Sequence, residues 1–363
     1  MKRQRRVRML WTWCLAAIAL LVGGMALAEF PPLSGPEFPP GDVGAIGDSI
    51  GNQEDVDIAA GGSGFLVVWT DMRTSYNNFQ GLDQNGRDVY AALLDANGAM
   101  IGTTPIIISQ DVGSQQEPEV AWNGQNWLVI WEHEVSSGNG TAATKMVYGA
   151  RVAPDGTLLD TPSAIVEAPQ VAGNMTVMEV VANGSDWLVA GQADTGGGLR
   201  GVRVAADGTV LDTTPVLLAP GTGTQYGSVT IVSAQGEYLL VADEGGGIGF
   251  RGRRFTADLT PRGSLISLPG APTRIASNGT EYYVTWDPIG GMLRGSRMTL
   301  DGTMLDPGGI ALMESMYWDG DDSRVTWDGS FWWVFHWIPY PDGGLHFVRV
   351  AADGTLVDST PVY

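Results

Sequence analysis

Short apolar runs, separated by turns rich in Gly, Asn and Asp, repeat along the chain from about residue 55 to the C-terminus. The runs are rich in Val, Ile, Leu and Trp and lack the sustained period of an amphipathic helix, so we expect strands. Each copy holds four runs, and the second run opens on an aromatic residue: Phe65, Trp127, Trp187, Tyr238, Tyr282 and Trp332. These aromatics are 62, 60, 51, 44 and 50 residues apart. A repeat of this length with four short strands is typical of a propeller blade.

The repeats predict the fold class and the domain organisation. We predict an all-β protein, a six-bladed β-propeller of four-stranded antiparallel blades. The propeller would span residues 43–363, with blades beginning near residues 54, 117, 176, 228, 272 and 320. Residues 43–50 resemble the end of a fourth strand, and we expect them to close the ring against the sixth blade and cover its edge. Residues 29–42 are proline-rich and predict an extended linker.

Asn-Gly and Asp-Gly pairs mark four of the six first hairpins and five of the six second hairpins. They predict two-residue turns, in which both central residues take a positive φ. If Asp155 and Gly156 are central, Arg151 faces Asp160 across the second hairpin. The same count gives three more pairs: Arg203 with Asp212, Arg297 with Asp306, and Arg349 with Asp358. Opposite charges across a strand pair favour one register. We interpret these eight residues as structural.

The N-terminus has the features of a secretory signal peptide. Residues 1–8 are basic, residues 9–23 are apolar, and Ala26-Leu27-Ala28 fits a cleavage site. We predict an exported protein of the periplasm, the medium or the cell surface, without stable membrane insertion after cleavage of residues 1–28.

Charge and cysteine content limit the kinds of site and partner that the protein can have. Cleavage would remove Cys14, the single cysteine, and leave fifteen basic residues against 40 acidic ones, a formal net charge of −25. Disulfides, thiolate nucleophiles and cysteine metal ligands are thereby excluded from the mature chain. So acidic a protein repels nucleic acid, and we expect no nucleic-acid partner.

Carboxylates recur where the second strand of a blade ends: Asp71, Glu132, Asp243 and Asp287. In a propeller these strand ends lie on the face that carries the irregular b–c and d–a loops, where a is the first and d the last strand of a blade. A ring of carboxylates there could hold Ca²⁺ through oxygen ligands. An ordinary solvated strand end is the alternative.

Aromatic and acidic residues also gather in the loops of the last blade: Tyr317, Trp318, Trp337, Tyr340, Asp321 and Asp322. Flat aromatics beside carboxylates suit stacking and hydrogen bonding to a sugar or peptide. Packing between blades is the competing interpretation. We identify no catalytic residues, since nucleophile elbows, phosphate-binding loops and dinucleotide fingerprints are missing from the sequence.

The segments VAWNGQNWLVIW (120–131) and GARVAPDGTLLD (149–160) resemble the repeats of poorly characterised exported bacterial β-propeller proteins, and so do residues 180–189 with 201–212. The resemblance covers nearly all of the mature chain and implies a propeller, but it brings no assigned activity. A likeness to sialidase propellers is superficial, because the Ser-x-Asp-x-Gly-x-x-Trp pattern is missing.

Three functions remain open. Our leading hypothesis is a non-catalytic binding or surface-interaction protein, with a glycan or a surface protein on the irregular-loop face. The alternatives are a metal-dependent hydrolase or lyase, with the four strand-end carboxylates at the channel mouth, and a structural module of a cell-surface layer.

Overall fold

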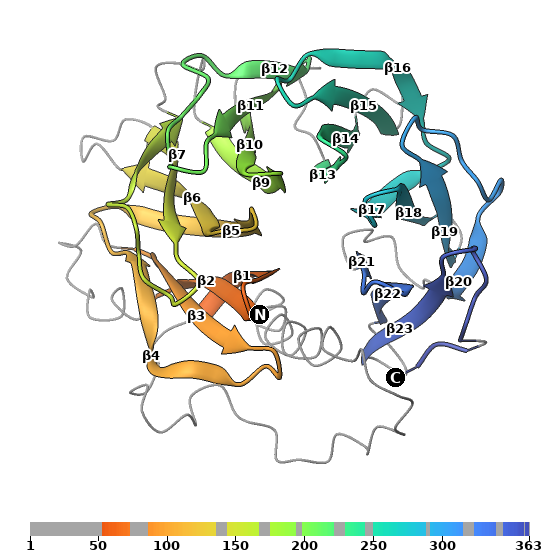
Figure 1. Cartoon of the computed structure of the whole chain (residues 1–363), viewed down its shortest axis with the longest axis horizontal. Helices are drawn as coiled ribbons and strands as arrows, with labels where there is room; N and C mark the ends of the chain where they lie inside the picture. Colours follow the sequence, from red (N-terminus) through yellow and green to blue (C-terminus); the bar gives the residue numbers. More distant parts are fainter. Residues whose placement is uncertain are drawn as a thin grey trace. The chain divides into compact units, whose positions relative to one another are not determined.

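The computed structural model describes residues 53–72, 86–135, 144–166, 175–193, 198–220, 229–243, 250–287, 291–314, 323–338, 344–358 and 360–362. Their strands form six small antiparallel sheets that follow one another along the chain (Figure 1). The predicted fold class, an all-β six-bladed β-propeller, is confirmed. The predicted signal peptide, linker and closing segment 43–50 lie outside the described residues. The chain divides into two compact units, residues 1–215 and 216–363, which we describe separately.

The first unit holds the first two blades and most of the third. The first sheet contains β1 (Gln53–Gly61), β2 (Gly64–Asp71), β3 (Asp88–Asp95) and β4 (Met100–Ser109). The second contains β5 (Ser114–Trp122), β6 (Trp127–Val135), β7 (Thr144–Val152) and β8 (Ser163–Val166). The third contains β9 (Met175–Asn183), β10 (Asp186–Ala193), β11 (Leu199–Val204) and β12 (Val216–Ala219), the last of which follows the unit boundary.

The second unit holds the other three blades. The fourth sheet contains β13 (Val229–Ala234), β14 (Glu237–Asp243), β15 (Phe250–Thr256) and β16 (Pro261–Ser267). The fifth contains β17 (Ala271–Ser277), β18 (Glu281–Asp287), β19 (Met292–Thr299) and β20 (Ile310–Glu314). The sixth contains β21 (Ser323–Trp327), β22 (Phe331–Ile338) and β23 (Gly344–Ala351).

The sixth sheet departs from the predicted four strands. Its last segment makes a single antiparallel bridge, in which Phe347 and Val362 exchange both backbone hydrogen bonds. One bridging pair is too short to count as a strand, so three strands remain.

The aromatic residue that opens the second strand of each blade belongs to the core. All six are at most 5 % exposed. In the first unit, Trp127 and Trp187 also join neighbouring blades. Their indole nitrogens donate to Ala59 O (3.3 Å) and Ala121 O (3.1 Å), each in the first strand of the preceding blade. The repeated aromatic residue therefore packs in the core of every blade. In these two blades it also donates a hydrogen bond to the preceding blade.

The turns occur where predicted, but their geometry is different. In the second hairpin of the second blade Val152 pairs with Leu158, and Ala153 N donates to Thr157 O, so the loop has three residues. Gly156 takes a positive φ of 86° and Asp155 does not, which is the three-residue loop with a terminal glycine bulge. The predicted register is therefore wrong by one residue. The Asn-Gly turns likewise place only their glycine at positive φ.

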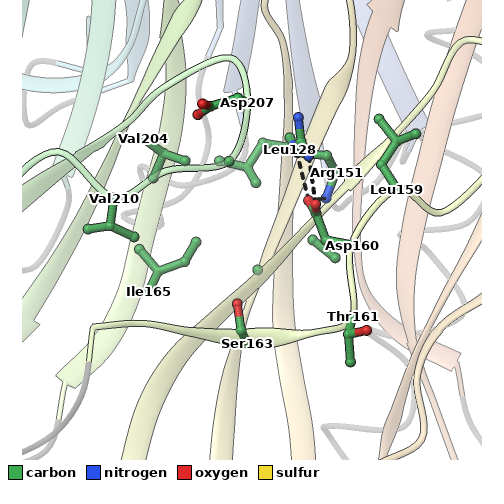
Figure 2. A pocket seen from close by; sticks show the side chains of 13 residues that line it. Leu128, Arg151, Leu159, Asp160, Thr161, Ser163, Ile165, Val204, Asp207 and Val210 are labelled. Carbon is green, nitrogen blue, oxygen red and sulfur yellow. Dashed lines mark hydrogen bonds and ion pairs between the residues drawn. The ribbon is translucent and has the colours of Figure 1, made fainter.

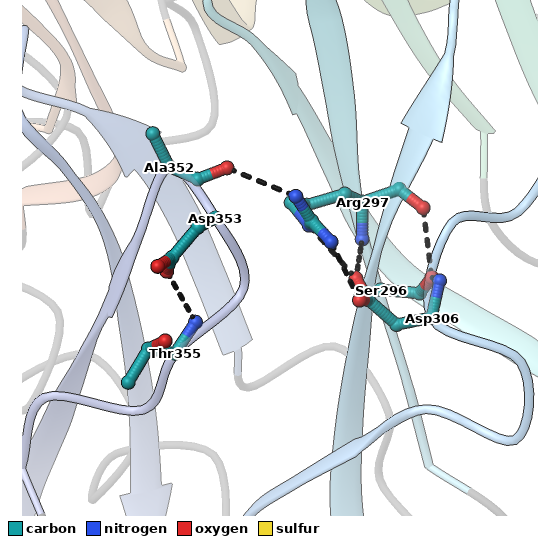
Figure 3. A network of polar contacts seen from close by, with 6 residues as sticks. All are labelled: Ser296, Arg297, Asp306, Ala352, Asp353 and Thr355. Carbon is teal, nitrogen blue, oxygen red and sulfur yellow. Dashed lines mark hydrogen bonds and ion pairs between the residues drawn. The ribbon is translucent and has the colours of Figure 1, made fainter.

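The four Arg–Asp pairs nevertheless form, because the aspartate reaches around the bulge. The closest N–O distances are 2.7, 2.6, 2.9 and 2.7 Å in chain order. Figure 3 shows the pair of the fifth blade, in which Asp306 also accepts from the backbone N of Arg297 at 2.9 Å. Arg297 Nη1 donates at 3.1 Å to Ala352 O in the turn of the sixth blade. Each such arginine clamps its own hairpin, and some also reach the next blade.

Candidate functional site

The predicted aromatic site falls largely outside the described residues. The structure does not describe five of its six residues, which are Tyr317, Trp318, Tyr340, Asp321 and Asp322. Trp337 lies in β22, but its side chain is outside the description as well. The aromatic site therefore stays a prediction.

The four strand-end carboxylates are only partly described. Asp71 and Glu132 are both fully buried, and Trp69 Nε1 donates to Asp71 Oδ2 at 3.1 Å. Asp243 and Asp287 end β14 and β18, and their side chains lie outside the description. Within the described part of the chain, no three His, Cys, Asp or Glu side chains are arranged to hold a metal ion. The calcium site also stays a prediction.

The first strands of the first two blades share a backbone irregularity at the end where the b–c and d–a loops lie. The register with the next strand shifts at residues 55–56 in β1 and at residues 117–118 in β5. Asp55 and Glu117 open these bulges with φ of 51° and 52°. A residue in this left-handed position is ordinarily glycine, and a longer side chain there costs about 1–3 kcal/mol. Two carboxylates thus occupy strained positions at equivalent places in adjacent blades.

A charged network runs beside these bulges and joins the two blades. Glu132, in β6, has a side chain only 1 % exposed, and its Oε1 lies 2.7 Å from Lys145 Nζ. The same oxygen accepts from Gln116 Nε2 at 2.6 Å. Gln116 Oε1 in turn accepts at 2.8 Å from Arg87 Nη1, and Arg87 Nη2 lies 3.7 Å from Glu54 Oε1. Glu132 Oε2 is buried without a hydrogen-bond partner among the described residues.

Glu117 is electrostatically coupled to this network. The residue is exposed, yet its carboxyl lies near enough protein atoms to lose part of its hydration, which raises its pKa. The negative charges of Glu132 and Asp55 raise the pKa of Glu117 further, and Lys145 and Arg87 act in the opposite direction. A carboxyl of raised pKa beside a buried carboxylate can accept or donate a proton at a bound ligand.

His133 lies next to Glu132 in β6 but points to the other face of the sheet. Gln115 Nε2 donates to Asp111 O at 3.0 Å and lies 3.1 Å from His133 Nδ1. Since an amide nitrogen only donates, we assign Nδ1 as the acceptor and Nε2 as the protonated nitrogen. Burial lowers the pKa of His133, although Asp111 opposes this. His133 is therefore a neutral packing residue rather than a charged member of the network.

The network defines the candidate site: Glu54, Asp55, Arg87, Gln116, Glu117, Glu132 and Lys145. Sequence reasoning identified only Glu132 among these. Pro118 was an available signal, because proline inside a strand is confined to edges and bulges. It follows Glu117 directly and marks the second bulge. In the first blade Val56 stands at that position, so the corresponding bulge had no such marker.

Comparisons with known proteins found similarity of structure and none of sequence. Neither a family model nor a characterised protein matches the chain. Among solved structures, a neuraminidase-like protein from A/bat/Guatemala/164/2009 aligns with 8 % identity and a TM-score of 0.46, covering 83 % of this chain and 84 % of that one. The periplasmic gluconolactonase of Pseudomonas aeruginosa aligns with 15 % identity and a TM-score of 0.45, covering 78 % and 80 %.

An α-L-arabinofuranosidase from Clostridium thermocellum aligns with 14 % identity and a TM-score of 0.40, covering 69 % of this chain and 94 % of that one. These similarities do not bear on the function of this chain. The described residues also contain no helix with the length and hydrophobicity of a membrane span.

Proposed function

We propose that this chain is an exported binding protein, with a ligand site at the end of the first two blades where the b–c and d–a loops lie. The observation that carries the proposal is Glu132 Oε2, a buried carboxylate oxygen with no donor among the described residues. Leaving such a group unsatisfied costs about 1–3 kcal/mol or more. A ligand that donates a hydrogen bond there would remove this cost.

The composition of the site suggests the chemistry of the ligand. Negative charges outnumber positive ones, because the site has four carboxylates (Glu54, Asp55, Glu117 and Glu132) and only one arginine and one lysine. Hydroxyl or ammonium groups would meet them favourably, and an anionic ligand would be repelled. We therefore favour a neutral polysaccharide over a protein partner. The aromatic residues predicted in the loops of the sixth blade stay a separate prediction of a sugar-stacking surface.

Replacing Glu132 tests the proposal. The purified protein is screened on a polysaccharide array, and the affinity for each hit is measured by calorimetry. We expect Glu132→Gln to weaken binding about 10- to 100-fold, because a hydrogen bond to a charged group contributes about 1.5–3 kcal/mol. The thermal melting temperature of the variant shows whether the fold is kept.

Asp155→Asn is the matched control. Asp155 is exposed in a turn at the other end of the same blade, and asparagine can still accept from Thr157 N. This control should bind as the wild type does. Equal affinities for wild type and Glu132→Gln, or a protein that binds no polysaccharide on the array, would contradict the proposal.

A hydrolase or lyase is the second candidate, favoured by one observation. Glu117 has a raised pKa beside Glu132, and such a pair can divide general-acid and charge-stabilising roles. The metal-dependent form of this candidate uses Asp71, Glu132, Asp243 and Asp287 as Ca²⁺ ligands. Turnover of an array polysaccharide that is lost in both Glu117→Gln and Glu132→Gln would favour this candidate. The third alternative, a structural module of a cell-surface layer, predicts no ligand.

A further inference from the structure

A cavity of about 320 Å³ lies between the second and third blades, at the end of the strands opposite to the candidate site (Figure 2). Its walls come from β6, β7 and β8 of the second blade and from β11 and the following turn of the third. The volume is at the lower end of the range of about 300–1,000 Å³ usual for small-molecule sites. All of its lining residues belong to the first unit.

One departure from the blade repeat lies in the lining of the cavity. In the first blade Ile106 pairs with Ala91, and a β-carbon on Gly156 of the next blade would lie only 3.0 Å from Ile106 Cδ1. In the fourth blade, Ile266 pairs with Gly252 and fills the corresponding space beneath Gly302.

The second blade has Ser163 at the equivalent position, paired with Gly149. A serine is too small to reach the turn of the next blade. At the corresponding glycine of the third blade, Gly208, a β-carbon would lie 2.9 Å from Arg151 Nε, so the arginine takes the place of isoleucine there and the cavity lies beside it.

The walls are apolar on one side and polar on the other. Leu128 and Val204 are 2 % and 1 % exposed and form the apolar side together with Ile165. In Figure 2 the Ser163 hydroxyl points into the space between Ile165 and Asp160. Asp160 is held by Arg151 through two side-chain bonds of 2.8 and 2.7 Å.

We propose that this cavity binds a single neutral sugar ring. An aliphatic wall suits the C–H face of such a ring, and the hydroxyl and carboxylate groups opposite suit its hydroxyls. Arg151 neutralises Asp160, and Asp207 at the rim adds a negative charge that disfavours anions. The site shares no residue with the Glu132 network, so it goes beyond the proposed function.

Placing isoleucine at position 163, as in the first and fourth blades, tests the inference. The probes are methyl glycosides of glucose, galactose, arabinose and N-acetylglucosamine. Their binding to the whole protein is measured by saturation-transfer NMR. We expect at least one to bind at millimolar concentration. Ser163→Ile should weaken its binding at least about tenfold by filling the cavity, whereas Ser163→Ala should weaken it less.

Two further variants keep the test decisive. If Ser163→Ile does not fold, Val210→Phe fills the same cavity from the third blade and should give the same loss. Asp155→Asn, which changes an exposed residue outside the cavity lining, should leave binding of the probe unchanged. Ser163→Ile should leave polysaccharide binding at the Glu132 site unchanged, which separates the two sites. No binding of any probe, or wild-type binding by a folded Ser163→Ile or Val210→Phe variant, would overturn the inference.

Discussion

Glu117 combines two features that destabilise a folded chain. Its φ of 52° is unfavourable for any residue with a β-carbon, and its carboxyl has a raised pKa near other carboxylates. A residue that stores strain and repulsion in this way is typical of a functional site rather than of a stability element. Replacing it should therefore make the protein more stable and bind less well.

Two substitutions at this residue separate charge from backbone strain. Because the folded pKa of Glu117 is above the unfolded value near 4.5, its penalty is absent below about pH 4.5 and grows as the pH rises through the folded pKa. Glu117→Gln should therefore melt at the wild-type temperature at pH 4 and above it at pH 7. Solvent exposure keeps this difference small.

Glu117→Gly should in addition relieve the left-handed strain, which contributes about 1 kcal/mol at both pH values. Thermal unfolding at pH 4 and pH 7 provides the measurement. A Gln variant that is stabilised equally at both pH values would show that the charge is not the cause.

At the scale of the element, the second hairpin of a blade is held by its Arg–Asp clamp. Burial acts to raise the pKa of Asp306, but side-chain and backbone hydrogen bonds from Arg297 lower it overall. Arg297 and Asp306 are each only 18 % exposed, so the pair is better shielded than a surface ion pair. The first blade has Leu93 and Gly102 at these positions and folds its hairpin by apolar packing.

A double-mutant cycle should measure this clamp. We expect Arg297→Met and Asp306→Asn each to lower the free energy of unfolding by about 1–2 kcal/mol, with a coupling of about 1 kcal/mol. Because the pKa of Asp306 is lowered, this coupling should persist above about pH 4 and fade as the pH falls through the folded pKa.

Arg251→Met is the control for the clamp. Arg251 lies in β15 and makes one exposed hydrogen bond, to Ser267 Oγ at 2.7 Å. Its loss should cost no more than about 0.5 kcal/mol. Additive single mutants in the Arg297–Asp306 cycle would show that the clamp does not stabilise the hairpin.

For the whole molecule, we expect the large negative net charge to affect stability. The chain has a formal net charge of −20 and a pI near 4.3, and self-repulsion of such a chain destabilises its compact state. Salt screens this repulsion, since the Debye length falls from about 30 Å at 0.01 M to about 10 Å at 0.1 M. Stability should therefore depend on ionic strength throughout the chain.

A comparison of salts separates this general effect from a metal site. We expect NaCl to raise the melting temperature by a few degrees, roughly the effect of 1 kcal/mol. A further rise with CaCl₂ at equal ionic strength, reversed by EDTA, is the outcome that the metal-dependent alternative predicts. Equal melting temperatures in the two salts would count against calcium at Asp71, Glu132, Asp243 and Asp287.

The strands, the place of the repeated aromatic and the Arg–Asp pairs could all be predicted, because alternation, turn residues and short hairpin contacts are local in the sequence. Trp127 and Arg151 illustrate this, since an aromatic recurs at the place of Trp127 in all six blades and an arginine at the place of Arg151 in the other four blades after the first. The turn register could not be predicted. The same Asp-Gly signal occurs in a two-residue loop and in a three-residue loop with Gly156 at positive φ.

The pattern within each repeat was enough to establish that this chain is a series of β-hairpin blades with an aromatic residue at the start of each second strand. Contacts between blades determine where chemistry can occur. The network of Arg87, Gln116 and Glu132 joins two blades, and the strain at Glu117 depends on a bulge in the pairing of β5 with β6. The cavity beside Ser163 exists only because a neighbouring blade supplies its far wall. Contacts between blades depend on how separate repeats pack together, which the local pattern within one repeat does not specify.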